Sequence, residues 1–106
     1  MSEEIHYKVL KLIEQSPKVT QREIASELGV SLGKANYCLQ ELIKKGWVKA
    51  SNFKNSNNKI AYAYLLTPKG IENKGVITLN FLKYKMTEYE LLKEEIKRLK
   101  QEVGSI

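Results

Sequence analysis

The sequence predicts a mainly helical fold with one small β-hairpin and a long C-terminal helix. Apolar residues recur at helical spacing in three successive segments before residue 46, and two stretches rich in β-branched and aromatic residues flank an asparagine-rich run. A single helical pattern then fills the last third of the chain. At 106 residues, with 42% hydrophobic and 28% charged residues, the chain is one ordinary globular domain with an appended element.

The first predicted helix covers residues 3–15. Its inward face carries four apolar residues at helical spacing: Ile5, Val9, Leu12 and Ile13. His6 has Glu3 one turn away but no other ligand type nearby, so we expect a surface residue rather than a base or a metal ligand. Pro17 ends the helix because the residue before a proline avoids helical dihedral angles.

Residues 20–48 predict two short helices joined by a tight turn. Thr20 and Glu23 form a T-x-x-E capping box that starts the first of them, and Gly29 can take the left-handed backbone that ends it. Ser31 caps the second, which ends at Gly46 after a basic last turn. The inward residues are Ile24, Ala25 and Leu28, then Val30, Ala35, Cys38, Leu39 and Leu42. This layout is typical of a helix-turn-helix that reads DNA.

Residues 47–53 and 59–66 predict the two strands of a hairpin, and the turn formers between them are Asn55, Ser56, Asn57 and Asn58. Tyr62 and Tyr64 fall on one face of the second strand, where we expect them to pack rather than to stack on bases. Three helices followed by a hairpin with a polar, basic tip make a winged helix-turn-helix, which we assign to residues 1–66.

Residues 67–106 predict a helical dimerisation segment. Thr67 and Pro68 begin a helix, and from Val76 to about Val103 the pattern is helical throughout. A helix this long extends beyond one compact domain, so we expect self-association in the manner of a coiled coil. The expected interface consists of Leu79, Leu82, Met86, Tyr89, Leu92, Ile96, Leu99 and Val103. The alternative is a helix that folds back along its own domain or frays after Glu90.

Positive charge is concentrated in the middle of the chain. The net charge is +6, and residues 34–59 alone hold six lysines against one acid, Glu41. Such a region attracts a polyanion, although a generic solvated basic surface gives the same pattern.

The outward positions of the second helix of the turn suit contacts with base edges in a major groove. These candidates are Leu32, Gly33, Asn36, Tyr37 and Gln40. Residues suited to phosphates, which fix register without reading sequence, are Thr20, Gln21, Ser31, Lys34, Lys44, Lys54 and Lys59. Simple solvation is the alternative for each polar residue taken singly.

Catalytic, metal and membrane functions are not expected. The chain has no acid–base pair beside a nucleophile and no phosphate-binding glycine loop, so we expect neither an enzyme nor a cofactor. Cys38, as the single cysteine, excludes an intramolecular disulfide and a multi-cysteine zinc site, and we expect a small buried hydrophobe with a redox switch as the alternative. The first residues lack a basic leader region and no apolar run approaches a membrane span, so a cytoplasmic protein is expected.

The run VTQREIASELGVSLGKANYCLQELIKKGWV, the following hairpin and the segment YAYLLTPKGIENKG resemble the winged-helix transcription factors of the MarR family. The Leu-Thr-Pro-Lys-Gly join at residues 66–70 and the run from Lys83 to Glu90 are similar to its small branch associated with bacterial exopolysaccharide genes. The resemblance implies a homodimeric transcription regulator on duplex DNA, with Ser31 to Gln40 as recognition helix and Asn52 to Ile60 as wing. Longer MarR proteins often hold an aromatic effector beside extra terminal helices. This chain has one terminal helix, so an effector is left unknown.

Two functions from different classes therefore remain open. The first is a sequence-specific regulator that binds double-stranded DNA as a homodimer. The second is a winged-helix adaptor that docks onto a protein partner through its terminal helix, because a fold alone does not settle a function. The net charge of the central region favours DNA.

Overall fold

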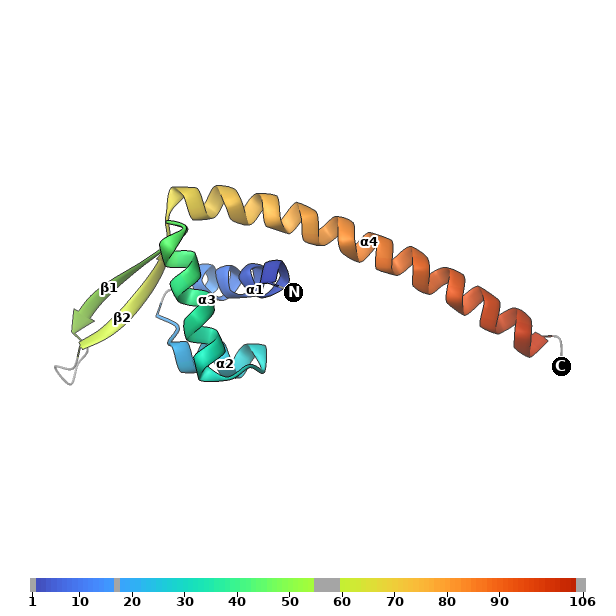
Figure 1. The fold of residues 1–106 in the computed structure, drawn as a ribbon, viewed down its shortest axis with the longest axis horizontal. Helices are drawn as coiled ribbons and strands as arrows, with labels where there is room; N and C mark the ends of the chain where they lie inside the picture. Colours follow the sequence, from blue (N-terminus) through green and yellow to red (C-terminus); the bar gives the residue numbers. More distant parts are fainter. Residues whose placement is uncertain (1, 17, 55–59, 105–106) are drawn as a thin grey trace.

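A computed structural model of the chain describes residues 2–16, 18–54 and 60–104 (Figure 1). It confirms the predicted mainly helical fold with one hairpin and a long terminal helix. The elements in order are α1 (Ser2–Gln15), α2 (Gln21–Leu28), α3 (Leu32–Lys44), β1 (Val48–Lys54), β2 (Ile60–Leu66) and α4 (Pro68–Gly104). Within these ranges, no helix has the length and apolar character needed to cross a membrane.

The helix-turn-helix is formed by α2 and α3, and its caps are those expected. The Thr20 hydroxyl accepts a hydrogen bond from the backbone N–H of Glu23 at 3.1 Å, and the Glu23 carboxylate accepts one from the backbone N–H of Thr20 at 3.3 Å. Gly29 ends α2 with a φ of 64°, a left-handed backbone that favours glycine. The Ser31 hydroxyl then accepts from the backbone N–H of Lys34 at 3.1 Å and starts α3.

One hydrophobic core joins the three N-terminal helices to the base of the hairpin and the start of α4. Most of the expected inward residues are buried, and Cys38 is a small buried residue as predicted. The buried hydrophobic residues are Val9, Leu10, Ile13, Val19, Ile24, Ala25, Ala35, Cys38, Leu39, Leu42, Val48, Tyr64 and Ile77. Leu28 and Val30 pack at its margin and are only partly buried.

The expectation that His6 lies on the surface was wrong. Its side chain is 5% exposed, and its Nε2 lies 3.3 Å from Oε1 of Glu41 on α3. The buried face of α1 is rotated by about one residue from the predicted one, because it contains Val9, Leu10 and Ile13 together with His6, while Ile5 and Leu12 are only half-buried. The polar partner on α3 is what allows the imidazole to be buried.

The hairpin is a two-stranded antiparallel sheet, with Val48 paired to Leu66 at its base and Lys54 to Ile60 at its outer end. Tyr64 is buried, which confirms its expected packing role. Residues 55–59 lie outside the described residues, as do the side chains of residues 51–63, so the predicted packing of Tyr62 has no structural test.

A tight joint links the end of α3, the start of β1 and the start of α4. Gly46 ends α3 with a φ of 76°, and the backbone N–H groups of Gly46 and Trp47 donate back to carbonyls of the last turn of α3. The Thr67 hydroxyl donates to the Gly46 carbonyl at 2.5 Å, and the Thr67 backbone N–H donates to the Trp47 carbonyl at 3.0 Å. Gly70 packs so closely here that a Cβ would overlap the carbonyl group of Trp47. The first turn of α4 is thereby fixed to the end of α3.

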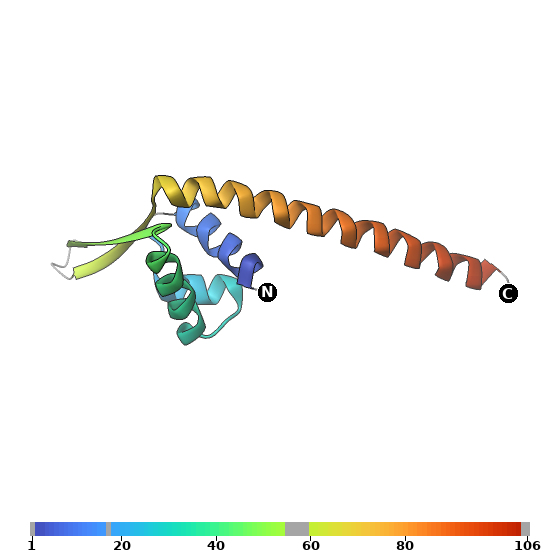
Figure 2. The same ribbon diagram turned by 45° about the horizontal axis from the view of Figure 1, so that its top comes forward.

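The long helix α4 packs antiparallel to α1 over its first part and then continues alone (Figures 1 and 2). Lys74 and Glu14 form an ion pair at 3.0 Å, and the rings of Phe81 and Tyr7 stack with centroids 5.1 Å apart. Thirty-seven residues give α4 a length of about 55 Å. Every residue from Leu82 to Gly104 is exposed, and the molecule is correspondingly elongated, at 69 × 27 × 20 Å.

Candidate nucleic-acid interface

The side of α3 that points away from the core forms a continuous surface, which we call the α3 outer face: Gly33, Asn36, Tyr37, Gln40 and Lys44. These residues are spaced three and four apart, so they share one side of the helix, and all are exposed. The opposite side carries the four buried residues of α3. Four of the five predicted base contacts therefore lie on one surface, and the fifth, Leu32, is 43% exposed at the start of the helix.

Asn36 on this face has a partner on the preceding helix. The Gln21 side chain donates a hydrogen bond from Nε2 to Oδ1 of Asn36 at 2.7 Å. Gln21 is the first residue of α2, and the turn between the helices brings it next to the first turn of α3. The bond limits the rotamers of Asn36, while its Nδ2 keeps both donors. A residue assigned to phosphates and one assigned to bases thus form a single unit.

Gly33 gives this face an opening near the start of α3. A Cβ at this position would meet nothing closer than the Ser31 hydroxyl at 4.0 Å, and the φ of Gly33 is not left-handed. Glycine inside a helix costs about 1 kcal/mol relative to alanine, and no contact within the described chain requires it here. A close approach of another molecule's backbone would use the missing side chain.

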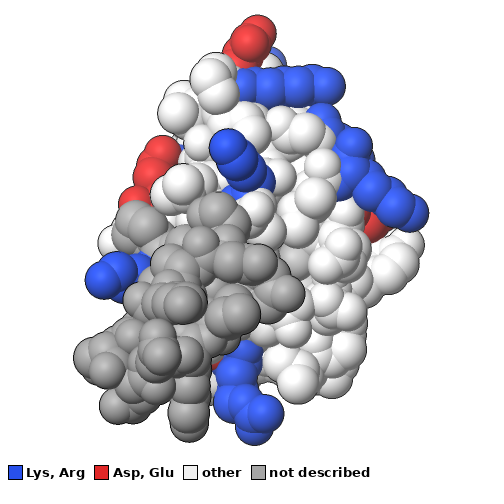
Figure 3. Space-filling view, turned by 90° about the vertical axis from the view of Figure 1, so that its left-hand side faces the viewer, with Lys and Arg blue, Asp and Glu red and all other residues white. Residues whose placement is uncertain are grey.

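Positive charge borders the α3 outer face. The lysines of this border are Lys34, Lys44, Lys45 and Lys49, all exposed, from α3 to the start of β1. Lys45 lies 4.9 Å above the ring of Trp47, which limits its movement. The one acid of the region, Glu41, faces His6 and is about two-thirds buried, so it weakens the border little. Figure 3 views the molecule from the left-hand side of Figure 1: Lys and Arg side chains, in blue, are spread over this end, and acidic ones appear mainly at its margins.

Of the remaining residues predicted to contact phosphates, the structure describes the side chains of some and not of others. Thr20 and Ser31 are exposed, but their hydroxyls already cap α2 and α3. The backbone of Lys54 ends β1, its side chain is not among those described, and Lys59 falls in residues 55–59, outside the described residues. Contacts from the hairpin tip therefore stay a prediction.

Sequence reasoning missed two polar contacts between helices of the winged domain, Gln21 to Asn36 and His6 to Glu41. The only sequence signal for the second is the spacing of His6 with Val9, Leu10 and Ile13, which completes a helical stripe once histidine is allowed inside. No signal in a single sequence marks the first.

Cys38 lies on the core side of α3, opposite the outer face. Burial raises the pKa of its thiol above the ordinary value of 9.0, the carboxylate of Glu41 adds to the rise, and Lys34 opposes it. The thiol is therefore protonated at neutral pH and is a poor nucleophile. Within residues 2–16, 18–54 and 60–104, no group of three His, Cys, Asp or Glu side chains could hold a metal ion.

An exposed polar helix face that follows a tight turn, with a hairpin beside it, defines a class of fold. The chain has the winged helix-turn-helix fold, and residues 2–49 match the family model described as winged helix-turn-helix DNA-binding. No curated protein matches the chain.

Solved structures of other bacterial proteins share this fold. A PadR-like transcriptional regulator from Bacillus cereus is 22% identical, with a TM-score of 0.73 over 82% of this chain and 89% of its own. A protein from Streptococcus mutans is 18% identical, with a TM-score of 0.77 over 88% and 90%. A MarR protein of Staphylococcus aureus, solved with salicylate and kanamycin, is 20% identical, with a TM-score of 0.58 over 91% and 67%. At these identities the likeness shows the fold, which is that of PadR and MarR regulators.

Proposed function

We propose that this protein is a transcription regulator that binds double-stranded DNA sequence-specifically as a homodimer. The observation that carries the proposal is the α3 outer face, where exposed amides of Asn36 and Gln40 stand beside four lysines. Amide side chains form bidentate hydrogen bonds with adenine in the major groove, and lysines neutralise phosphates. Leu32, Gly33 and Tyr37 complete the set that contacts bases, while Thr20, Gln21, Ser31, Lys34, Lys44, Lys54 and Lys59 contact the backbone.

The homodimer is supported by the apolar surface of α4. The eight residues predicted as an interface, which we call the α4 stripe, are between 43% and 69% exposed, from Ile96 to Val103. Single exposed apolar residues are ordinary, but an unbroken stripe on a projecting helix is typical of an interaction surface. We assign residues 1–66 to DNA binding and residues 67–106 to dimerisation on this basis.

The narrower role rests on the sequence resemblance. The join at residues 66–70 and the run from Lys83 to Glu90 support a place in the small MarR branch, and hence control of exopolysaccharide genes in the bacterial cytoplasm. An effector is left open.

A protein-interaction adaptor is the second candidate, because the same α4 stripe could receive a helix of another protein. An adaptor of this kind does not need the α3 outer face or the lysines that border it. DNA binding therefore separates the two proposals.

The test begins with selection of genomic fragments bound by the wild-type protein. Affinity is then measured by fluorescence anisotropy for a selected duplex and for a scrambled one, at several salt concentrations. Asn36→Ala or Gln40→Ala should weaken the selected duplex by about 1 to 3 kcal/mol and leave the scrambled one nearly unchanged. Lys44→Ala should weaken both and reduce the salt slope by about one unit.

Lys97→Ala is the matched control, since this lysine is exposed near the far end of α4 and should change neither duplex. Absence of binding to any duplex at low salt would reject the DNA proposal and favour the adaptor. Sedimentation tests the dimer separately: a monomer at tens of micromolar would reject it while leaving DNA binding to its own assay.

A further inference from the structure

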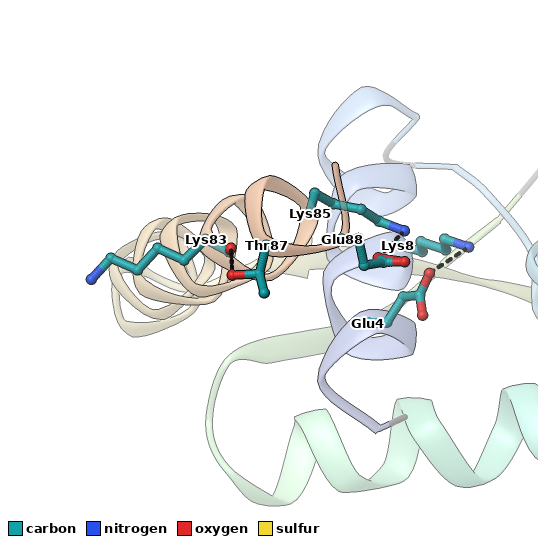
Figure 4. A network of polar contacts seen from close by, with 6 residues as sticks. All are labelled: Glu4, Lys8, Lys83, Lys85, Thr87 and Glu88. Carbon is teal, nitrogen blue, oxygen red and sulfur yellow. Dashed lines mark hydrogen bonds and ion pairs between the residues drawn. The ribbon is translucent and has the colours of Figure 1, made fainter. Parts of the chain in front are cut away.

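The apolar stripe of α4 has two halves that differ in what surrounds them. The first half starts beside α1, where Phe81 stacks on Tyr7, and the side chains of Lys85 and Glu88 lie near the early turns of α1 (Figure 4). In Figure 4 the Lys85–Glu88 ion pair, 3.1 Å, lies beside the Lys8–Glu4 pair of α1, 3.4 Å. Beyond Glu88, α4 has passed α1, and every side chain to Gly104 is exposed. The apolar residues of this second half are therefore exposed to solvent.

The apolar residues of the second half follow a regular heptad pattern. Tyr89, Ile96 and Val103 occupy a positions, and Leu92 and Leu99 occupy d positions. β-branched residues at a with leucine at d favour two-stranded parallel coiled coils over higher oligomers. Within parallel coiled coils, the pattern therefore indicates two strands.

The charged residues beside this stripe indicate the direction in which two copies pair. Each g position is acidic, and each e position is basic: Glu88, Glu95 and Glu102 at g, and Lys93 and Lys100 at e. In a parallel pair, a g residue meets the e residue five positions later on the other helix. Glu88 then meets Lys93 of the second copy, and Glu95 meets Lys100. All these contacts are attractive.

An antiparallel pair lacks this complementarity, because g residues then face g residues and e residues face e residues. Centred on the second half, such a pair sets glutamate against glutamate and lysine against lysine. Centred on Tyr89, it gains a contact between Glu95 and Lys85 of the other copy. It also places Lys83 against Lys93 and Lys100 of the other copy, so the balance is mixed.

We propose that residues 89–103 of α4 pair in parallel and in register with the same segment of a second copy of this chain. The proposal rests on the homodimer proposed above and adds its direction. Both winged domains then lie at one end of the paired helices, and the C-termini lie together at the other. The heptad frame of residues 79–89 is offset by one stammer from the frame of residues 89–103. Its flanking charges also favour the parallel direction, since Lys85 at g meets Glu90 at e of the other copy.

Cysteine cross-linking tests the direction. In a Cys38→Ala background, Leu99→Cys places one thiol at a core d position, and mild oxidation should give a covalent dimer in near-complete yield. Helicity by circular dichroism checks that the variant is folded. In the antiparallel pair centred on Tyr89, residue 99 lies opposite residue 79, so a mixture of Leu79→Cys and Leu99→Cys chains should give only the mixed dimer. That result overturns the parallel direction and keeps the homodimer.

Charge exchange is an independent test that leaves the apolar core unchanged. Glu95→Lys or Lys100→Glu alone should raise the dimer Kd roughly tenfold, because each creates two repulsive contacts per dimer. The double variant should return to within about twofold of wild type. Lys97→Glu, at an outward position of the same turns, is the matched control and should change the Kd little. Single variants that leave the Kd unchanged overturn the proposal, and sedimentation of the wild type as a monomer overturns the homodimer itself.

Discussion

The side chains of Gln21 and Asn36 are joined by a hydrogen bond of 2.7 Å that spans the turn between α2 and α3. The bond fixes the direction of an amide on the α3 outer face from a different helix. Asn36 Oδ1 has a second lone pair and Nδ2 two donors, so the bonded amide can still meet an adenine edge. Gln21 is thus placed to orient Asn36, for which we propose a contact with a base.

Replacing Gln21 by alanine should therefore reduce the discrimination between a selected and a scrambled duplex more than it reduces the affinity for DNA in general. We expect the preference for a selected duplex over a scrambled one to fall by about 0.5 to 1.5 kcal/mol, the usual contribution of one hydrogen bond. Anisotropy titrations of Gln21→Ala, Asn36→Ala and the double variant measure the coupling between the two residues. Gln15→Ala, on the exposed end of α1, is the control. Additive losses would mean that the bond does not orient Asn36 on DNA.

The two glycines in the first turns of α4 should respond in opposite ways to alanine. Gly70→Ala forces a methyl group into the carbonyl of Trp47, whose carbonyl carbon would lie 2.8 Å away, so the free energy of unfolding should fall by about 1 to 3 kcal/mol. Gly75 has nothing within 4 Å of its Cβ direction, and Gly75→Ala should raise stability by up to about 1 kcal/mol. Urea unfolding followed by circular dichroism compares them. Equal changes in the free energy of unfolding for the two variants would contradict the close contact between Gly70 and the Trp47 carbonyl.

The stacked pair of Tyr7 and Phe81 should hold α4 against α1. Phe81→Ala removes the stack and half-buried apolar surface, so the free energy of unfolding should fall by about 1 to 2 kcal/mol. Tyr84→Ala on the same stretch of α4 is the control, because Tyr84 is 56% exposed and should change stability by less than about 0.5 kcal/mol. Both are measured at one protein concentration, and a loss as large for Tyr84→Ala would argue against the stack.

Stability should decline at alkaline pH partly through Cys38. Burial raises the pKa of this thiol in the folded state, so the folded protein retains its proton at pH values where the unfolded chain loses it. The resulting stabilisation is complete below the ordinary pKa of 9.0 and is lost as pH rises through the folded-state pKa. Urea unfolding between pH 8 and pH 10.5 should show a steeper decline for wild type than for Cys38→Ala. Equal declines in the free energy of unfolding for the two proteins would exclude a contribution from the Cys38 thiol.

Local signals made much of the fold predictable from sequence. Thr20, Ser31 and Gly46 mark the ends of helices because a cap depends on residues within one turn, and each end lies where expected. The outward face of α3 follows from spacing alone. The burial of His6 could not be predicted in this way, since its partner Glu41 is 35 residues away in the chain. The hydrogen bond between Gln21 and Asn36 could not be predicted either, since the two residues are 15 positions apart in the chain.

The joint between Gly46, Trp47, Thr67 and Gly70 makes α4 a lever arm for α3. Thr67, which precedes α4, donates hydrogen bonds to Gly46 and Trp47, and these two residues donate to the last turn of α3, so the two helices tilt as one body. Over a helix of about 55 Å, a tilt of 5° at the joint moves the far end by roughly 5 Å. Whatever restrains the distant end of α4 therefore sets the angle of α3 with high mechanical leverage.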